Sequence, residues 1–584
     1  MAKPKVKPII KKPKAKNLNS SSGAPIWFEK NYSTLCISVL VLAGVLRLLL
    51  LFELPSMPFN QLHQATELDM HFFDQWGDRI ANGDILTDTV WHPYHYWHSH
   101  IASASGIDDP VAGKQLWNEW YGGKKFHQEP LYPLLIGFAK TIAGEGHLFI
   151  AIIQMLLGLV GIWMVMWLGK YYFGAMAGIL GGLLFSLYNP NLLFETALLR
   201  TSLSTTLLLS LIFLSEKMYM GKGKPFLFGI LGGLGYLLMT TSILLWFPLV
   251  IRWLYLRRSE LINLWKVIAG FLIIISFLVI RNSIAEVPLF STSSVGPVTY
   301  VCSNFPKYEP EMGFAYFPEV GQIMESSGGR MLPAALAVID LHKSPGGWVL
   351  LQFKKLGAVF HWYEIPNNIN SYLAEKMSFT LPLAFIPFSV IAALGLMGIV
   401  MNLKNRKTFS LIIGILSQVV IMVIFYVLCR FRIPMVAMMA IFAGYTLQQL
   451  AFLKTPKHIM LISVGTIAFF ILVLRPMPRI PVTFEKGDVA TSFQVYFLPR
   501  LHVLEKNGDL AGCTVLLDKL INTMPSYFRK INSISELSSQ KEKDLASFYG
   551  TLCFDESELY KNIGNIQEAN KYLALSQKLN PPDN

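Results

Sequence analysis

The sequence predicts an all-α protein that crosses a membrane many times. Of its 584 residues, 53% are hydrophobic, and the mean hydropathy of +0.44 favours a membrane protein over a string of soluble domains. The apolar residues are also grouped in runs, each long enough for a helix that crosses a hydrocarbon layer of about 30 Å. A third observation is the net charge of +13, which is concentrated near the N-terminus.

Eleven apolar runs have the length of a membrane-spanning helix. They lie at 33–54, 147–168, 174–192, 200–215, 225–240, 242–257, 264–280, 379–402, 409–428, 433–450 and 457–475. The pair within 225–257 is the least regular, and it could be one long bent element. We therefore expect about eleven membrane helices.

The basic tail sets the predicted orientation. Residues 1–30 carry eight Lys and one Glu, which is typical of a cytosolic segment before a first span, and a nucleic-acid-binding role is a weaker alternative. With this tail inside, the loops that fall on the cytosolic side are all basic. The two long loops, at about 55–146 and 281–378, and the C-terminal region then face outward. We expect a cytosolic tail (1–30), a membrane domain (31–476) and an extracytoplasmic domain (477–584).

The first outer loop carries the candidate catalytic acid. In the helical stretch ELDMHFFDQWGDRIANGD, Asp69 lies on one face with Phe72, Phe73, Trp76 and Ile80. An acid in an apolar stripe beside a membrane is costly unless a partner or a reaction needs it. Asp69 is thus the candidate general base. Glu129, from HQEPLYP at the other end of the loop, could close on Asp69 as an orienting partner or as half of a metal site, and we favour the first.

Several charged residues interrupt the predicted outer face of the bundle. They are Glu195, Arg200, Arg281, Arg430 and Arg432. Single arginines at an interface often only extend to the lipid headgroups. Together at one membrane level they favour a site that grips a phosphate or pyrophosphate.

The histidines of the first loop do not predict a metal centre. His92, His95, His98 and His100 match no standard zinc spacing, and aromatic residues alternate with them. An interfacial aromatic cluster is the better interpretation, although Trp91, Trp97, Trp117 or Trp120 could stack on a sugar ring. We expect no required cofactor, although a divalent metal is possible.

The second outer loop and the C-terminal region are less specific. SIAEVPLFSTSSVGPVTYVCSN and KKLGAVFHWYEIPNNINSY mix Gly, Pro, Ser and Asn with aromatic residues, which favours folded loops over helices. Near the C-terminus, two segments, from Lys506 to Tyr527 and from Lys561 to Asn584, share a helical pattern and a late proline. This pattern resembles the second helix of a tetratricopeptide repeat. We predict a small helical domain there.

The ordered motifs LDMHFFDQWGDRIANGD, HQEPLYPLLIGF, VIRNS, EIPNN and CRFRIP resemble the landmarks of bacterial GT-C membrane glycosyltransferases. These are relatives of protein O-mannosyltransferases and of the lipid A aminoarabinose transferase. The similarity covers roughly residues 35–475, and some members also carry C-terminal tetratricopeptide repeats. It implies a GT-C-like fold in a bacterial inner membrane. It also implies a polyprenyl-phosphate-linked sugar donor, a protein, lipid or glycan acceptor, contact with membrane lipid and no nucleic-acid partner.

The resemblance also implies roles for individual residues. Asp69 would be the base of an inverting transfer, with Glu129 and Glu195 as further acids. The donor phosphate would be held by Arg281, Arg432, Arg430 and Arg200, in that order of motif support. Other motif positions expected to face substrate or order the loops are Glu67, His127, Tyr132, Glu364 and Asn368.

Two other classes of protein remain as alternatives. A transporter or flippase would line a path with these charges, but we find no interrupted helices in matching halves. A scaffold for envelope assembly would leave Asp69 and the arginines without a role.

Overall fold

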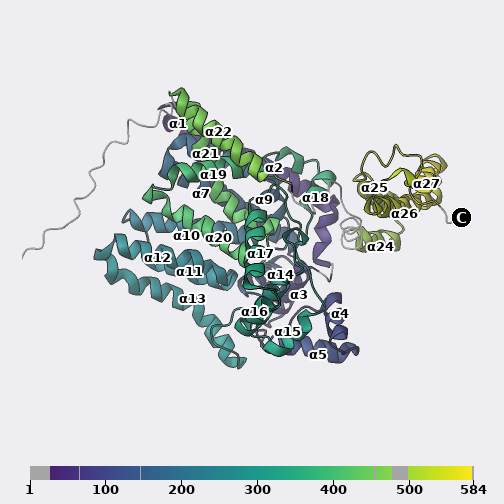
Figure 1. Cartoon of the computed structure of the whole chain (residues 1–584), viewed down its shortest axis with the longest axis horizontal. Coiled ribbons are helices and arrows are strands. Elements are labelled where there is room, and N and C mark those ends of the chain that lie inside the picture. The colour runs from purple at the N-terminus through teal and green to yellow at the C-terminus, as the bar shows by residue number, and fades with distance from the viewer. Residues whose placement is uncertain are drawn as a thin grey trace, which may run out of the picture.

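The computed structural model of the chain describes residues 26–64, 66, 68–144, 146–452, 455–476 and 497–581. Within these ranges the regular elements are helices and no strand forms, which confirms the predicted all-α class (Figure 1). Most helices form one large bundle. A smaller group, α24 to α27, stands apart from it at the C-terminal end (Figure 1). Most of the predicted basic tail lies outside the described residues.

Six stretches of the described chain are long and apolar enough to cross a membrane. They are Tyr32–Ser56, which includes α2 (Tyr32–Glu53); His147–Phe173 (α7); Arg258–Ile284, which includes α13 (Leu264–Ile284); Arg406–Ile424, which includes α20 (Phe409–Ile424); Cys429–Phe452 (α21); and Pro456–Val473 (α22). By length and composition, this is a multi-pass membrane protein.

The predicted count of eleven spans is not confirmed. The other expected spans are shorter or more polar helices: α8 (Ala175–Ser186), α10 (Thr201–Tyr219), α11 (Pro225–Leu238), α12 (Ile243–Leu256) and α19 (Phe388–Asn402). The expected run 174–192 divides because α8 ends at Ser186 and the short α9 (Asn189–Phe194), with a proline in its first turn, begins a new helix. The run 225–257 is two helices joined by η3 (Thr240–Ser242). A twelve-residue helix rises only about 18 Å, which is less than the thickness of a bilayer core.

Small residues let α8 pack tightly between α7 and α21. A Cβ atom on Gly178 of α8 would lie 2.4 Å from the Met166 carbonyl oxygen of α7. One on Gly181 would lie 2.8 Å from the Ala440 carbonyl oxygen of α21. Glycines at such positions allow helix backbones to approach in a membrane protein. Helices α7, α8 and α21 are therefore closely packed.

The described residues of the segment predicted as the first outer loop include four α-helices. They are α3 (Asp69–Ala81), α4 (Tyr96–Ala104), α5 (Pro110–Trp120) and α6 (Leu131–Ala143). Helix α3 forms as predicted, with Phe72, Phe73 and Trp76 buried. It packs closely on α6, because a Cβ atom on Gly77 would lie 2.4 Å from the Ile136 side chain. The buried aromatic face therefore fixes α3, and with it the acid at its first position.

The second outer loop is more helical than predicted. It contains α14 (Gly296–Asn304), α15 (Val320–Ser327), α16 (Met331–Asp340), α17 (Pro345–Val359) and α18 (Ser371–Met377). The prediction of irregular loops was wrong for 296–304 and for the start of the segment that begins at Lys354. Pro297 and Pro345 are in the first turn of a helix, where a missing N–H costs nothing. The segment between α17 and α18 is non-helical, as predicted.

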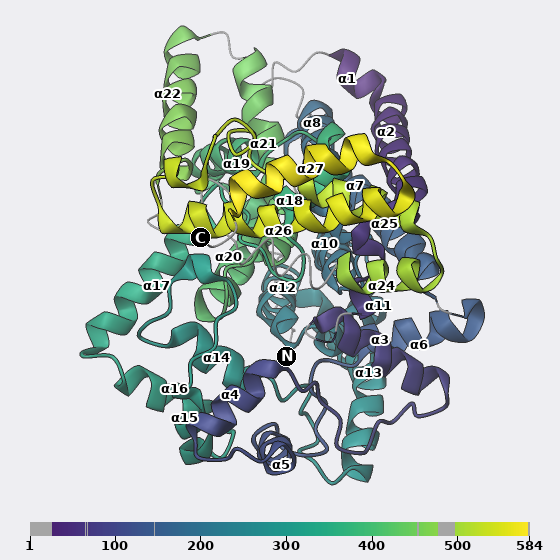
Figure 2. The same cartoon turned by 90° about the vertical axis from the view of Figure 1, so that its right-hand side faces the viewer.

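The C-terminal helices are α24 (Leu498–Lys506), α25 (Leu510–Ile521), α26 (Gln540–Ile563) and α27 (Ile566–Leu579). Both turns follow one plan: Gly508 and Gly564 have φ of +72° and +87°, and the next residue, Asp509 or Asn565, caps the following helix. Helices α26 and α27 lie side by side (Figure 2). The predicted helical domain is thus two helix–turn–helix pairs, whereas the tetratricopeptide assignment stays a prediction.

Candidate active site

A cavity of about 900 Å³ lies where the two outer loops meet the membrane bundle. Charged and polar residues from distant parts of the chain form one part of its wall: Asp69, His127, Glu129, Arg200, Asn368 and Arg430. The cavity therefore brings together six of the twelve residues that the sequence singled out.

Other parts of the wall are aromatic or apolar. The outer loops contribute the aromatic side chains Tyr96, Trp97, Phe314 and Tyr316. The outer end of α20 contributes Ile421, Met422 and Phe425. The cavity thus has a charged part, a part suited to stacking on rings, and a part continuous with a membrane-spanning helix.

Asp69 is held in this cavity by three side chains. One carboxylate oxygen, Oδ2, lies 2.6 Å from a terminal nitrogen of Arg430 and accepts a 3.0 Å hydrogen bond from the Asn368 amide. The other, Oδ1, accepts a 3.2 Å bond from Gln128. The backbone N–H of Asp69 in turn donates to Asn368 Oδ1 at 3.2 Å. The position at the start of α3 also favours a negative charge.

These contacts set the charge state of the acid. Burial raises the pKa of Asp69, but the Arg430 charge and the Asn368 and Arg430 hydrogen bonds lower it, and the net result is a pKa well below the usual range. Asp69 is therefore an ion-paired carboxylate at neutral pH. In this state it is a weak base.

Asn368 reaches Asp69 from the predicted EIPNN segment. Its backbone φ of +63° lies in the left-handed region, which asparagine tolerates better than most residues. The segment is tied to the start of α21 by the Cys429 N–H, which donates to the Ile365 carbonyl at 2.9 Å. A tight turn thus places Asn368 and Arg430 on the same carboxylate.

Glu129 forms a second acid–arginine pair in the cavity. One of its oxygens, Oε2, is paired with Arg200, and Oε1 accepts 3.1 Å bonds from the backbone N–H and the hydroxyl of Thr240. Burial raises the pKa of Glu129. The Arg200 charge and the hydrogen bonds from Arg200 and the Thr240 backbone lower it by more, so the net shift is downward. The expected contact between Glu129 and Asp69 does not form; the adjacent Gln128 makes it instead.

His127 is buried in the cavity wall and precedes Glu129 by two residues in the sequence. Its backbone carbonyl accepts 3.2 Å bonds from the N–H groups of Ser294 and Val295. Its Nδ1 is buried and has no hydrogen-bond partner among the described residues. Burial and the neighbouring His92 hold the pKa of His127 well below its usual value, so the ring is neutral. A neutral imidazole can donate or accept a hydrogen bond to a bound hydroxyl.

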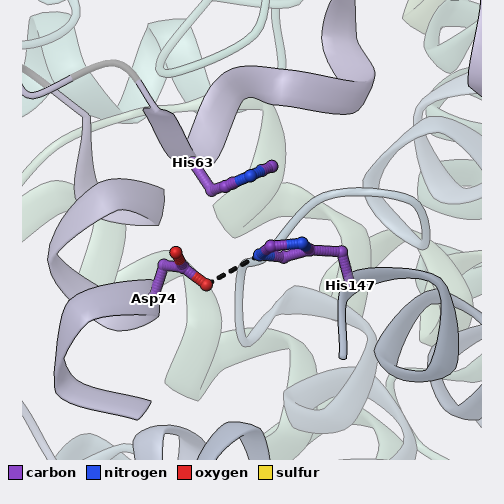
Figure 3. Close-up of side chains that lie close together, drawn as sticks. All are labelled: His63, Asp74 and His147. Carbon is purple, nitrogen blue, oxygen red and sulfur yellow. Dashed lines mark hydrogen bonds and ion pairs between the residues drawn. The ribbon is translucent and has the colours of Figure 1, made fainter. Parts of the chain in front are cut away.

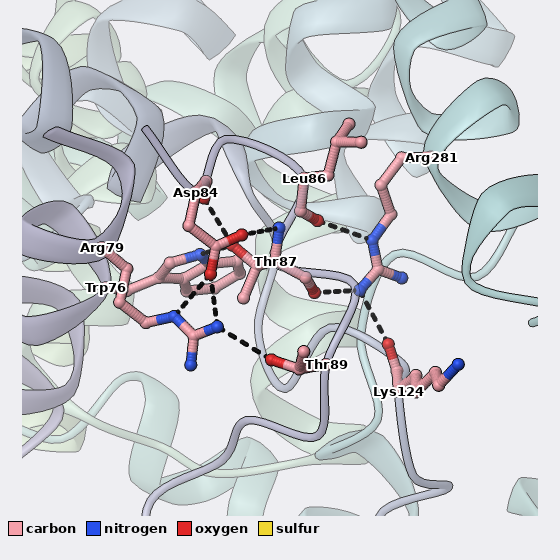
Figure 4. A network of polar contacts seen from close by, with 8 residues as sticks. All are labelled: Trp76, Arg79, Asp84, Leu86, Thr87, Thr89, Lys124 and Arg281. Atoms are coloured by element: carbon pink, nitrogen blue, oxygen red, sulfur yellow. Dashed lines mark hydrogen bonds and ion pairs between the residues drawn. The ribbon is translucent and has the colours of Figure 1, made fainter. Parts of the chain in front are cut away.

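Arg281 and Arg432 are not on the cavity wall. Arg281 donates to the carbonyl oxygens of Leu86 (3.0 Å), Lys124 (2.7 Å) and Thr87, as Figure 4 shows. Arg432 is fully buried and donates to the carbonyl oxygen of His361 at 2.7 Å and to that of Tyr363. Both guanidinium groups hold the outer loops in place.

The remaining predicted residues also lie away from the cavity. Glu195 is buried against Arg47 of α2, at 2.6 Å. Tyr132 donates to Gln154 at 3.1 Å, and Glu364 accepts a 2.6 Å bond from Tyr188. Glu67 lies outside the described residues.

Two cavity residues had no clear sequence signal. Gln128 is an uncharged residue between His127 and Glu129, and Thr240 is the last residue of the predicted run 225–240 and the first of η3. The polar Thr-Thr-Ser sequence at the junction of two predicted spans is the one sequence feature that indicates Thr240. The loop histidines are packed among aromatic rings, as expected; His98 Nε2 lies 2.9 Å from the Tyr121 hydroxyl.

Comparison with known proteins gives one family match, over part of the chain, and one similar solved structure. Residues 127–280 match the family described as dolichyl-phosphate-mannose-protein mannosyltransferase, a segment that includes His127, Glu129 and Arg200. Among solved structures, an oligosaccharyltransferase from Archaeoglobus fulgidus, tethered by a disulfide to an acceptor peptide with the NVT sequon, is similar at 16% identity and a TM-score of 0.35. The alignment covers 78% of this chain and 57% of that chain. No curated protein sequence matches.

Proposed function

Starting from the match of residues 127–280 to the mannosyltransferase family, we propose that this protein is a GT-C membrane glycosyltransferase. It moves a sugar from a polyprenyl-phosphate-linked donor to an acceptor hydroxyl at the outer face of the membrane. The observation that carries the proposal is the pair of acid–arginine contacts, Asp69–Arg430 and Glu129–Arg200, on the wall of one cavity. Such a site has the bases and the phosphate-binding cations that this transfer needs.

The donor would lie with its phosphate between the two arginines. A guanidinium binds phosphate oxygens through two parallel hydrogen bonds, which fixes the leaving group. The apolar end of α20 gives the polyprenyl chain a route back to the membrane, through Ile421, Met422 and Phe425. The aromatic residues of the outer loops would then stack on the sugar or on the acceptor.

Donor binding would activate Asp69. A phosphate at Arg430 competes with the carboxylate for the same guanidinium, and it thereby weakens the contact that lowers the pKa of Asp69. The freed carboxylate takes the proton from the acceptor hydroxyl, whose oxygen attacks the anomeric carbon from the side opposite the phosphate. The configuration at that carbon inverts, and the polyprenyl phosphate leaves. Asn368 keeps Asp69 oriented throughout.

The positive charges of the N-terminal tail and of the alternate loops support an outward-facing site. The basic tail and the basic alternate loops favour a cytosolic N-terminus. The bacterial inner membrane is what the resemblance to bacterial GT-C enzymes implies. The cavity and the helices α24 to α27 would then face outward. The acceptor, whether protein, lipid or glycan, reaches the cavity from that side.

A transfer assay tests the proposal. Purified protein is given a panel of polyprenyl-phosphate sugars and an envelope extract, with Asp69→Asn beside the wild type and Asp108→Asn, an exposed acid of the same loop, as a matched control. We expect transfer to fall by at least about 100-fold in Asp69→Asn, the lower range for a general base, and to persist in Asp108→Asn. Equal transfer by both variants removes Asp69 as the base. Absence of transfer by the wild type with every donor contradicts the function itself.

A further inference from the structure

A cluster of two histidines and an acid lies outside the cavity. His63 is near the end of η2 (Pro58–Gln64), Asp74 is on α3, and His147 is the first residue of α7. Each offers one ligand atom, and these three atoms lie within 4.8 Å of one another. Figure 3 shows the three side chains facing one another from three separate elements. The proposed transfer does not use them.

The contacts within the cluster are short and specific. His147 Nε2 lies 2.7 Å from Asp74 Oδ1. The two imidazole rings are stacked, with centroids 3.6 Å apart and an interplanar angle of 22°. The backbone carbonyl of His63 lies 2.8 Å from His71 Nδ1, which holds the end of η2 against α3. All three residues are partly exposed, so an ion has access from solvent.

The nearby lysine does not block this cluster. Lys140 Nζ lies 2.8 Å from Asp74 Oδ1 and 2.6 Å from Asp78 Oδ1. Because the lysine has this second carboxylate one helical turn away, it keeps an ion pair when Asp74 binds a cation. Asp74 is therefore available as a ligand, at the cost of one of two contacts to the lysine.

We propose that His63, Asp74 and His147 form a binding site for a divalent transition metal of the zinc type. Two imidazole nitrogens and one carboxylate oxygen suit Zn²⁺ or Co²⁺, whereas Mg²⁺ and Ca²⁺ prefer oxygen ligands. When the ion binds, the His63 ring turns out of its stack with the His147 ring. One ring nitrogen of His63 and Nε2 of His147 then both face the ion. Water completes the coordination.

Such an ion would brace the segment that carries Asp69. The chain between His63 and Asp74 contains the start of α3, and the ion would tie both of its ends to α7. The site is structural in this scheme and takes no part in proton transfer. It does not depend on the proposed function, because its binding is measured without donor or acceptor.

The test is metal binding to the purified, tag-free, chelator-treated full chain. Co²⁺ titration followed by visible absorption, and Zn²⁺ titration by calorimetry, are run on the wild type, His63→Ala, Asp74→Asn and His147→Ala. The control is His100→Ala, an exposed histidine of the same loop. We expect one ion per chain in the wild type and the control. In the three cluster variants the affinity falls by at least roughly 100-fold, since even the loss of an outer hydrogen bond to a ligand costs up to that much.

Thermal stability supplies a second readout that separates folding from binding. We expect Zn²⁺ to raise the apparent melting temperature of the wild type and of His100→Ala, because it binds the folded chain, and to leave folded His63→Ala unchanged. Wild-type affinity in His63→Ala or His147→Ala overturns the site. So does the absence of a stoichiometric ion in the wild type, or an equal loss of binding in His100→Ala.

Discussion

Asp69 is bound by the side chains of Arg430, Asn368 and Gln128 and also lies on the wall of the cavity. Burial raises its pKa, but the Arg430 charge and the hydrogen bonds from Asn368 and Arg430 lower it by more. A carboxyl whose pKa is lower in the folded than in the unfolded protein stabilises the fold at pH values above its unfolded-state pKa of about 4. This stabilisation is lost as the pH falls towards the pKa of the folded state. The ion pair therefore stabilises the protein throughout the neutral range.

The pH dependence of stability follows from the downward shift of the Asp69 pKa. We expect the apparent melting temperature of the wild type to exceed that of Asp69→Asn near pH 7, and the difference to shrink as the pH falls below about 4. Melting curves of both proteins in detergent across that range measure it. A difference that stays constant as the pH falls contradicts the ion-paired state of Asp69.

Arg430 is predicted to bind the donor phosphate. We expect Arg430→Ala to raise the donor KM by about 10-fold or more, because a hydrogen bond to a charged group contributes about 1.5–3 kcal/mol. Arg430→Lys should recover part of the loss, since it keeps the charge without the bidentate geometry. Arg330→Ala, an exposed arginine of the second outer loop, is the control. An unchanged KM in Arg430→Ala assigns the phosphate to other residues.

At the residue scale, the structure brings some of the predicted site residues together and separates others. Asp69, Glu129, Arg200 and Arg430 do share one cavity. Arg281, which had the strongest motif support, instead donates to backbone carbonyls. A motif shows that an arginine is present near a membrane face, but only the fold decides which partner its side chain meets.

At the scale of elements, helix α3 depends on its contact with α6. We expect Gly137→Ala to destabilise the protein by about 1–3 kcal/mol, because the new Cβ would lie 2.5 Å from the Ile80 side chain. Gly44→Ala is a matched control, since nothing lies within 4 Å of its Cβ position. Melting temperatures compare the two. Equal stability of both variants contradicts the close α3–α6 packing.

The loop after α3 depends on Arg281. We expect Arg281→Lys to increase proteolysis within residues 82–90 and to leave the donor KM unchanged, because an ammonium group cannot span the carbonyl oxygens of Leu86, Thr87 and Lys124. Limited proteolysis and donor titration measure the two effects. A raised KM with unchanged proteolysis returns Arg281 to the phosphate site.

Elements with a clear period were predicted better than those marked by glycine and proline. The aromatic stripe of α3 predicted its helix and its buried face. Around α14, Gly296 and Pro297 indicated a loop, although proline also suits the first turn of a helix. Local composition could not separate these two cases without the packing partners.

At the scale of the whole molecule, the predicted orientation is open to labelling. The five cysteines are all buried free thiols, so the native chain should react little with a membrane-impermeant maleimide. We expect Asp108→Cys and Lys561→Cys to react in intact spheroplasts, and Lys404→Cys to react only after permeabilisation. Reaction of Lys404→Cys from outside contradicts the orientation.

The number of spans was harder to predict than the class. An apolar run such as 174–192 contains no charge, so hydropathy reads it as one span, yet the chain turns at Ser186. Helices that are covered by their neighbours are apolar whether or not they cross the bilayer. Composition therefore indicates the membrane class more reliably than it indicates the number of spans.

The Asp69–Arg430 contact joins residues 361 positions apart in the chain. During synthesis the acid is in place long before its cation exists, and the cavity cannot close until α21 has been translated and inserted. A stalled or truncated chain therefore exposes an uncompensated carboxylate at the membrane surface and has no working site. Two separately expressed fragments, divided between α19 and α20, would regain the site only by docking in the membrane.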